Sequence, residues 1–297
     1  MRFATFFLTA VLAFLSVRTW ADPASVVSQV DAPGATTYTD AVGINKRGEI
    51  VGSFTDARPL VHGYVFRNGA FTALEVPGVH TVPLGINDGG DIVGFGVTNG
   101  SEIHGLLWNK GGDPTQIDAP DADITYFHGI NNRGQIVGHS REDIFALARA
   151  FLWQDGNFTF LDIPGVLLAG RGRESMGIND RGQVVGTCQI QGVNHGFLID
   201  HGDVTLIDVP GATATYVSGI NNRGEIVGTY SDADSVGHGY LRNAKGAITR
   251  IEASNATGIE PVRLNDRGDI VGMFSESGQV HGFLFTQSPS LIALNRH

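Results

Sequence analysis

Short runs of apolar residues recur along the chain, and each run ends at a glycine or at a polar turn. The clearest repeat is Gly-Ile-Asn-x-x-Gly-x-(Ile or Val)-Val-Gly, as it stands at residues 43–52. Its copies begin at Gly43, Gly85, Gly129, Gly177 and Gly219, and a degenerate sixth copy begins at Arg263. The copies lie about 42 to 48 residues apart, which is the length of one supersecondary unit that packs against its neighbours.

Each repeat predicts four short antiparallel strands. The first ends in Gly-Ile-Asn, the second is the Ile-Val-Gly run, and the third begins at His-Gly followed by an aromatic residue or leucine. The fourth resembles residues 71–75 and is ended by Pro-Gly. Asn-x-Arg-Gly suits a type I turn with its glycine in the left-handed region, and Asn68-Gly69 suits a two-residue hairpin turn. No 3.6-residue period is sustained, so the pattern favours strands over helices.

Four antiparallel strands in a repeat of this length are typical of a β-propeller blade. The chain has an orphan fourth strand near Asp31, and it ends with an orphan first-to-third set from Leu264 to Phe285. In a closed ring the N-terminal strand completes the C-terminal blade, so no open sheet edge remains at the seam. We therefore predict an all-β fold, a six-bladed β-propeller of four-stranded blades closed in this way. A β-solenoid is the structural alternative.

The N-terminus has the pattern of a signal peptide. Arg2 supplies a basic start, an apolar block runs from Thr5 to Val17, and small residues precede a cleavage site after Ala21. We therefore expect residues 1–21 to be removed, residues 22–297 to form the propeller domain, and the product to be secreted or periplasmic. Cleavage would remove two arginines and make the net charge −12 instead of −10.

The composition excludes several classes of protein. Thirty acidic and twenty basic residues argue against a nucleic-acid binder, which needs a basic stripe. No apolar run reaches the ~18 residues of a membrane span. Cys188 is the single cysteine, so we expect it to be a small buried hydrophobe without a disulfide. No phosphate loop, nucleophile elbow or zinc spacing is present, so we expect no cofactor and no metal. We also expect a monomer.

The repeat motifs resemble the HAF-type extracellular repeat of bacterial secreted proteins. The resemblance rests on Gly-Ile-Asn-x-Arg-Gly-x-Ile-Val-Gly followed by His-Gly-Phe or a variant, and it covers nearly the whole chain after residue 21. The name of that repeat implies His-Ala-Phe, whereas this chain mostly has glycine in the middle and has Arg149-Ala150-Phe151 in its third copy. The resemblance implies an extracellular location and a repeat fold, and it transfers no catalytic residues.

The recurring histidines are expected to form structural cross-strand pairs with carboxylates. Counting outward from the hairpin turns pairs His62 with Glu75, His104 with Asp118, Arg149 with Asp162, His195 with Asp208, His238 with Glu252 and His281 with Asp31. The third copy has arginine in place of histidine, which keeps a cation opposite a carboxylate but removes a metal ligand. This substitution favours pairs worth roughly 0.2–1 kcal/mol each over a metal site.

A ligand site is predicted on the loops of the third and fourth repeats. The longest fourth-to-first loop is residues 166–175, after Pro164-Gly165. The candidate ligand-binding residues are Tyr126, His128, Arg141, Arg171, Arg173 and Glu174. Arginines, carboxylates and an aromatic ring on one rim could hold an acidic sugar or a peptide carboxylate. Weaker catalytic candidates are His128 or Tyr126 as a base, with Arg171 or Arg173 neutralising a substrate carboxylate.

Three functions remain open from the sequence. The first is a secreted binding or interaction module whose ligand is a glycan or a protein, and even repetition without a catalytic signature favours it. The second is a polysaccharide lyase or glycoside hydrolase with its site on the rim of the third and fourth blades. The third is a purely structural surface protein. Fold alone does not choose among them, because propellers host unrelated functions.

Overall fold

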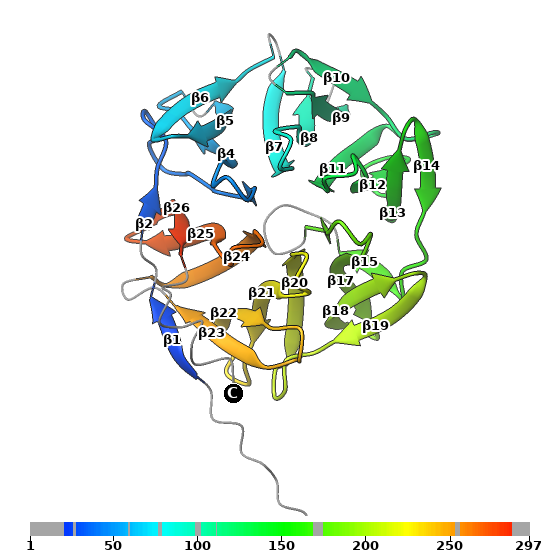
Figure 1. Ribbon diagram of the computed structural model, residues 1–297. Coiled ribbons are helices and arrows are strands. Elements are labelled where there is room, and N and C mark those ends of the chain that lie inside the picture. The colour runs from blue at the N-terminus through cyan, green and yellow to red at the C-terminus, as the bar shows by residue number, and fades with distance from the viewer. Residues whose placement is uncertain are drawn as a thin grey trace, which may run out of the picture.

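The computed structural model of the chain is all-β (Figure 1). It describes residues 21–25, 28–58, 60–76, 79–98, 102–110, 112–168, 175–252 and 256–286. These residues form strands, turns and bends without a helix, and therefore without any helix long and apolar enough to cross a membrane. Residues 1–20 of the predicted signal peptide lie outside the described residues.

Residues 43–160 follow the predicted four-strand pattern. The first sheet contains β3 (Gly43–Ile44), β4 (Ile50–Thr55), β5 (Val61–Arg67) and β6 (Ala70–Leu74) in this order. Next come β7 (His80–Ile86), β8 (Ile92–Val97), β9 (Ile103–Trp108) and β10 (Pro114–Ile117), then β11 (Ile124–Ile130), β12 (Ile136–Arg141), β13 (Arg149–Gln154) and β14 (Asn157–Phe160). These two sets are joined into one sheet by a single parallel register pair, Ile124 with Ile103.

Three further sheets complete the chain. One contains β15 (Val166–Leu168), β16 (Gly177–Ile178), β17 (Val184–Ile190), β18 (Val193–Asp200) and β19 (Asp203–Ile207). The next contains β20 (Ala214–Ile220), β21 (Ile226–Ser231), β22 (Gly237–Arg242), β23 (Ile248–Glu252) and β1 (Ala21–Ser25). The last contains β24 (Gly258–Leu264), β25 (Ile270–Glu276), β26 (Gln279–Phe285) and β2 (Ser28–Val30).

Two features of these sheets differ from the prediction. Residues 166–168 were expected in a loop, but they form β15 because they pair with residues 187–189 of β17. The sequence also did not predict β1, which adds a fifth, parallel strand outside β23. The N-terminal segment therefore contacts two neighbouring sheets before the first full repeat begins.

The sheets follow one another around a common centre, with β7, β11, β20 and β24 innermost (Figure 1). The predicted offset of the termini is present, since β2 pairs antiparallel with β26 and Gln29 lies opposite Phe283. The turn chemistry also agrees with the sequence. Gly48 has a φ of 81°, and both turn residues of the first outer hairpin, Asn68 and Gly69, have positive φ (52° and 79°).

Six asparagines tie the repeats together around the centre. Each Nδ2 donates to the backbone carbonyl of the asparagine in the next repeat: Asn45 to Asn87 (3.1 Å), Asn87 to Asn131 (3.3 Å), Asn131 to Asn179 (2.9 Å), Asn179 to Asn221 (3.1 Å), Asn221 to Asn265 (3.0 Å) and Asn265 to Asn45 (3.0 Å). The last bond returns to the first repeat. Each Oδ1 is used too; that of Asn45 accepts the N–H groups of Arg47 and Glu49 and fixes its own turn. These buried amides explain why the repeat has asparagine here.

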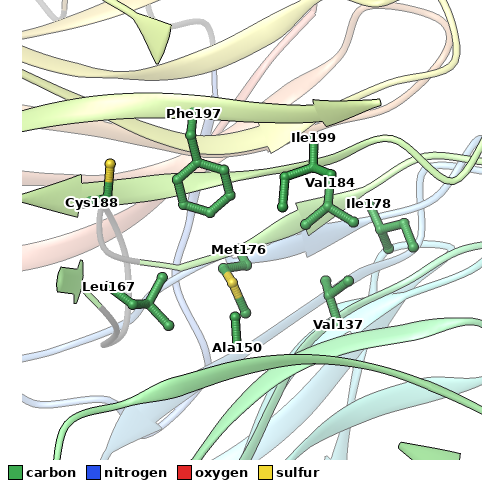
Figure 2. Close-up of a cluster of buried hydrophobic side chains, with 9 residues drawn as sticks. All are labelled: Val137, Ala150, Leu167, Met176, Ile178, Val184, Cys188, Phe197 and Ile199. Carbon is green, nitrogen blue, oxygen red and sulfur yellow. The ribbon is translucent and has the colours of Figure 1, made fainter. Parts of the chain in front are cut away.

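Apolar side chains fill the space between neighbouring sheets. Figure 2 shows one such cluster, in which Val137 and Ala150 lie on one side and Met176 and Phe197 on the other. Fully burying a side chain such as Phe197 contributes roughly 1.5–3 kcal/mol. Cys188 belongs to the same cluster, and burial raises the pKa of its thiol to about 11. The thiol is therefore a packing group and not a nucleophile.

Candidate functional site

Four of the six expected cross-strand pairs are present. The separations are 3.1 Å between His62 Nδ1 and Glu75 Oε1, 3.1 Å between His104 Nδ1 and Asp118 Oδ2, 2.8 Å between His195 Nδ1 and Asp208 Oδ1, and 2.9 Å between His281 Nδ1 and Asp31 Oδ2. The last pair joins the two ends of the chain. In all four, the histidine lies on the third strand of its sheet and the carboxylate directly follows the outermost strand, which agrees with a structural role for them.

The expectation is wrong for the other two pairs. His238 Nε2 lies 2.7 Å from Asp232 Oδ2 and not on Glu252, because the turn before β22 brings Asp232 to it; Asp232 Oδ1 accepts the N–H of Val236 and orients the carboxylate. Glu252 pairs with Arg250. Arg149 does not pair with Asp162, because its guanidinium lies over the ring of Phe160, 3.8 Å from the centroid. Such stacking on an aromatic face is favoured by a flat cation.

The structure brings two of the predicted site residues together inside the protein. Tyr126 stacks on His139 with ring centroids 4.7 Å apart, and His128 Nε2 lies 2.8 Å from His139 Nδ1. Both histidines are fully buried, and burial together with nearby Arg263 lowers the pKa of His128 to about 3. His128 is thus neutral and out of contact with solvent, so it is not placed to act as a base on a substrate.

Of the remaining predicted site residues, the structure describes only Arg141, whose charge helps to lower the pKa of His139. Arg141 ends β12 opposite Ile124 and is half-buried. Arg171, Arg173 and Glu174 lie outside the described residues, so their part in a site stays a prediction. Within the described residues, no group of three or more His, Cys, Asp or Glu side chains is arranged to hold a metal ion.

The centre of the ring is filled by Arg263, a residue that the sequence identified only as a degenerate repeat position. Glycine occupies this position in the other repeats because the inner strands meet there; a Cβ on Gly177 would lie 3.0 Å from Gly219 Cα. The guanidinium of Arg263 is buried, and it donates to the carbonyl oxygens of His128 (2.8 Å) and Met176 (2.7 Å). Arg263 therefore ties three different sheets to one another across the centre.

At one end of the opening in the middle of the ring of sheets, the lining side chains hydrogen-bond to one another. A cavity of about 70 Å³ lies here beside the asparagine ring. Asp180 Oδ2 accepts from Asn132 Nδ2 (2.8 Å) and from Asn222 Nδ2 (2.7 Å), and Asp88 Oδ2 accepts from Asn132 (2.9 Å). The carboxylates are thus used in holding the repeats together, which argues for a structural role.

A larger pocket lies between the β20–β23 sheet and the β24–β26 sheet, and we call it the inter-sheet pocket. Its volume is about 280 Å³. It is lined by Thr229, Tyr230, Ser231, Gly237, Thr257, Gly258, Ile259, Glu260, Met273, Phe274, Ser275 and Val280. Strands β21, β24 and β25, which are neighbours in Figure 1, supply most of these residues. This pocket could not be predicted from the sequence, because its walls come from two different repeats.

Two glycines leave space in the inter-sheet pocket. A Cβ on Gly237 or on Gly258 would meet no atom within 4 Å. Neither glycine has a positive φ, so neither is required by backbone geometry. The sequence gives only a weak signal for them. Gly258 lies five residues before Arg263, and the corresponding residue of the first repeat, five before Gly43, is Tyr38. The open space therefore results from missing side chains and not from an inserted loop.

The lining combines hydroxyl groups, one carboxylate and an apolar wall. Thr229 is only 5% exposed, and its Oγ1 finds no hydrogen-bond partner among the described residues. Leaving a buried hydroxyl unsatisfied costs about 1–3 kcal/mol. Oγ1 itself has less than 1 Å² of exposed surface, so a ligand hydroxyl would satisfy it once the Thr229 side chain rotates toward the pocket. Phe274 and Ile259 supply apolar surface, so the pocket suits a small molecule with a polar edge and an apolar face.

Known proteins resemble this chain in fold and not in sequence. No protein-family model matches it, and no curated protein is similar enough in sequence to count as a relative. Among solved structures, AofleA from Arthrobotrys oligospora is similar with 14% identity, covering 87% of this chain and 86% of that chain at a TM-score of 0.59. The Aleuria aurantia lectin, described as a six-bladed β-propeller that recognises fucose, is similar with 11% identity, 90% and 95% coverage and a TM-score of 0.54.

A protein whose description names an enzyme is similar to the same degree. A putative gluconolactonase is 12% identical, with 90% of this chain and 94% of that chain covered at a TM-score of 0.54. At such low identity these likenesses bear on the fold alone. Together with the ring of sheets, they place the chain among the β-propellers.

Proposed function

We propose that this protein is a six-bladed β-propeller that binds carbohydrate in the inter-sheet pocket. Six repeats linked by six asparagine hydrogen bonds support the blade number, and the β2–β26 pairing supports closure by the N-terminal strand. The lectin among the similar structures supports a carbohydrate ligand. The observation that carries the proposal is the unsatisfied Oγ1 of Thr229 in the wall of a pocket with hydroxyl and aromatic groups.

We also propose that the protein acts outside the cytoplasm and belongs with the HAF-type repeat proteins. The N-terminal pattern of residues 1–21 and the repeat motif support this placement. A binding role is favoured over the lyase or hydrolase role because His128, its main candidate base, is buried and neutral.

Isothermal titration of methyl glycosides and oligosaccharides against the protein tests the proposal. Wild type should bind at least one sugar, and Gly258→Leu should abolish that binding by filling the pocket. Thr229→Val should weaken it about tenfold, the equivalent of one lost hydrogen bond of about 1.4 kcal/mol. Thr205→Val on the exposed face of β19 is the matched control and should bind as wild type does. Absence of binding across the panel would overturn the proposal, as would binding that survives Gly258→Leu.

A further inference from the structure

We infer that the loop between β12 and β13, residues 142–148, is a docking site for a basic protein segment that carries apolar side chains. Three large apolar side chains of this loop face solvent: Ile144 is 65% exposed, Phe145 89% and Leu147 70%. The other exposed large apolar residues that the structure describes are at most 51% exposed. Single exposed apolar residues are ordinary on a protein surface, but three within four positions form a patch, and such patches mark interaction sites.

The backbone of the loop holds these side chains outward. Asp143 Oδ1 accepts the N–H groups of Phe145 (2.7 Å) and Ala146 (2.9 Å), which fixes the turn. Ala146 is half-buried, and Ala148 packs against the apolar cluster of Figure 2. The small residues of the loop are therefore the more buried ones and the large apolar residues the more exposed, the reverse of what burial favours. A contact surface that is fixed in advance loses little conformational entropy on binding.

Corresponding turns in other repeats show that the turn does not require an apolar residue at its tip. In the turn between β4 and β5, Asp56 Oδ1 accepts the N–H of Arg58 at 2.8 Å. In the turn between β21 and β22, Asp232 Oδ1 accepts the N–H of Asp234 at 3.0 Å. The same hydrogen bond thus forms with a charged residue at the position that Phe145 holds in the third repeat. Because a charged residue serves the turn equally well, the exposed ring of Phe145 is better explained by contact with another molecule.

The charges beside the apolar tip indicate which kind of partner fits it. Glu142 and Asp143 directly precede the apolar residues, and both are exposed. Ile124 lies opposite Arg141 in the strand register, so Asp123, the exposed residue before Ile124, borders Glu142. Three carboxylates therefore lie on one side of the tip.

The row of carboxylates continues toward the second repeat. Glu102 extends it, because the residue after Glu102 pairs with Ile124; its side chain is 66% exposed and lies 3.6 Å from His104 Nε2. Of the two arginines that flank the loop, Arg141 is half-buried and Arg149 is stacked on an aromatic ring. The exposed charge beside the tip is therefore mainly negative, and it attracts a basic segment. A second copy of this chain or an anionic lipid surface would bring like charge to it.

Peptides of opposite charge test this inference. The probes are an amphipathic helical peptide of leucine and lysine and its counterpart of leucine and glutamate, equal in length and labelled for fluorescence anisotropy. The lysine peptide should bind wild type at least tenfold more tightly than the glutamate peptide. Ile144→Ser/Phe145→Ser/Leu147→Ser should weaken that binding at least tenfold, and Asp123→Asn/Glu142→Gln should weaken it several-fold. Val204→Ser/Leu206→Ser removes two exposed apolar side chains from β19 and should bind as wild type does.

The opposite results would overturn the inference. They are no binding of the lysine peptide, equal binding of the two peptides, and binding that survives the triple substitution in the loop. Neutral phosphatidylcholine vesicles that sediment with wild type but not with the triple variant would assign the loop to a lipid surface instead. A wild-type dimer that the triple substitution dissociates in analytical ultracentrifugation would assign it to a second copy. Circular dichroism shows that each variant is folded, and none of these outcomes depends on whether the inter-sheet pocket binds a sugar.

Discussion

The last sheet, β24–β26, is bordered by two gaps that differ in what fills them. On one side, the hydroxyl of Tyr38 contacts Met273 Sδ at 3.9 Å and donates to Asp40 Oδ2 at 2.8 Å. On the other side, Gly258 occupies the repeat position that corresponds to Tyr38, and the inter-sheet pocket is open. The two gaps share the same repeat geometry. A propeller of this kind can therefore gain a binding site by losing a side chain at one position, with no change to its strands.

A second pair of equivalent positions makes the same point about polar groups. Thr229 and His139 both follow the glycine of the Ile-Val-Gly run, and both have a buried atom without a hydrogen-bond partner among the described residues. Thr229 faces the open pocket, whereas His139 is packed against Tyr126 and His128. The hydroxyl of Thr229 can bind a ligand, whereas the unsatisfied nitrogen of His139 only lowers the stability of the fold.

The largest expected effect is acid destabilisation from the packed histidines. The pKa of His128 falls from an ordinary value near 6.5 to about 3 on folding. Above pH 6.5 His128 is neutral in both states; below it, the unfolded chain binds a proton that the folded chain does not. Stability should therefore fall by about 1.4 kcal/mol per pH unit between pH 6.5 and 3 from this residue. Urea unfolding over this range measures the slope. His128→Asn should reduce it, whereas the exposed control His201→Asn should not, and equal slopes in all three proteins would contradict the account.

Opening the filled gap should cost the next largest amount. Tyr38→Ala removes a half-buried aromatic ring and its two contacts, and should lower the free energy of unfolding by about 2–3 kcal/mol. Thermal or urea unfolding measures this loss. A change below about 0.5 kcal/mol would show that the ring does not fill the gap.

Filling the open gap should change binding and leave stability nearly unaltered. Gly258→Leu places a side chain where no atom lies within 4 Å of the new Cβ. The free energy of unfolding should stay constant or rise by about 0.5–1 kcal/mol, as in cavity-filling variants. Ala70→Leu on the exposed edge of β6 controls for the added surface. A loss of more than about 2 kcal/mol in Gly258→Leu would mean that the space is not open.

The smallest effect is expected from the outer histidine pairs. His195→Gln removes the 2.8 Å contact with Asp208 on partly exposed strands. It should cost roughly 0.2–1 kcal/mol, because exposed pairs are screened by solvent. A double-mutant cycle with Asp208→Asn isolates this pair. A coupling above about 2 kcal/mol would assign the pair a larger part in stability than its exposure allows.

Local chemistry could be predicted from the sequence, and contacts between repeats could not. The turn glycines, the hairpin at Asn68-Gly69 and the carboxylate partner of His62 follow from spacing within one repeat. The asparagine ring could not be predicted, because each of its hydrogen bonds joins two repeats. The motif of one repeat does not fix the distance to the next repeat. His238 pairs with Asp232 and not with Glu252, because the turn before β22 brings Asp232 close to it. The shape of that turn cannot be derived from residue spacing. The inter-sheet pocket was missed for a further reason: it depends on an absent side chain at Gly258, and a missing group leaves little signal.

The central claim is that the inter-sheet pocket holds a sugar. Calorimetric titration of one bound neutral glycoside into wild type and into Gly258→Leu, side by side, tests it most directly. The account predicts saturable binding to wild type and none to Gly258→Leu, with both proteins melting at similar temperatures. Equal binding by the two proteins would contradict it and move the site elsewhere on the propeller.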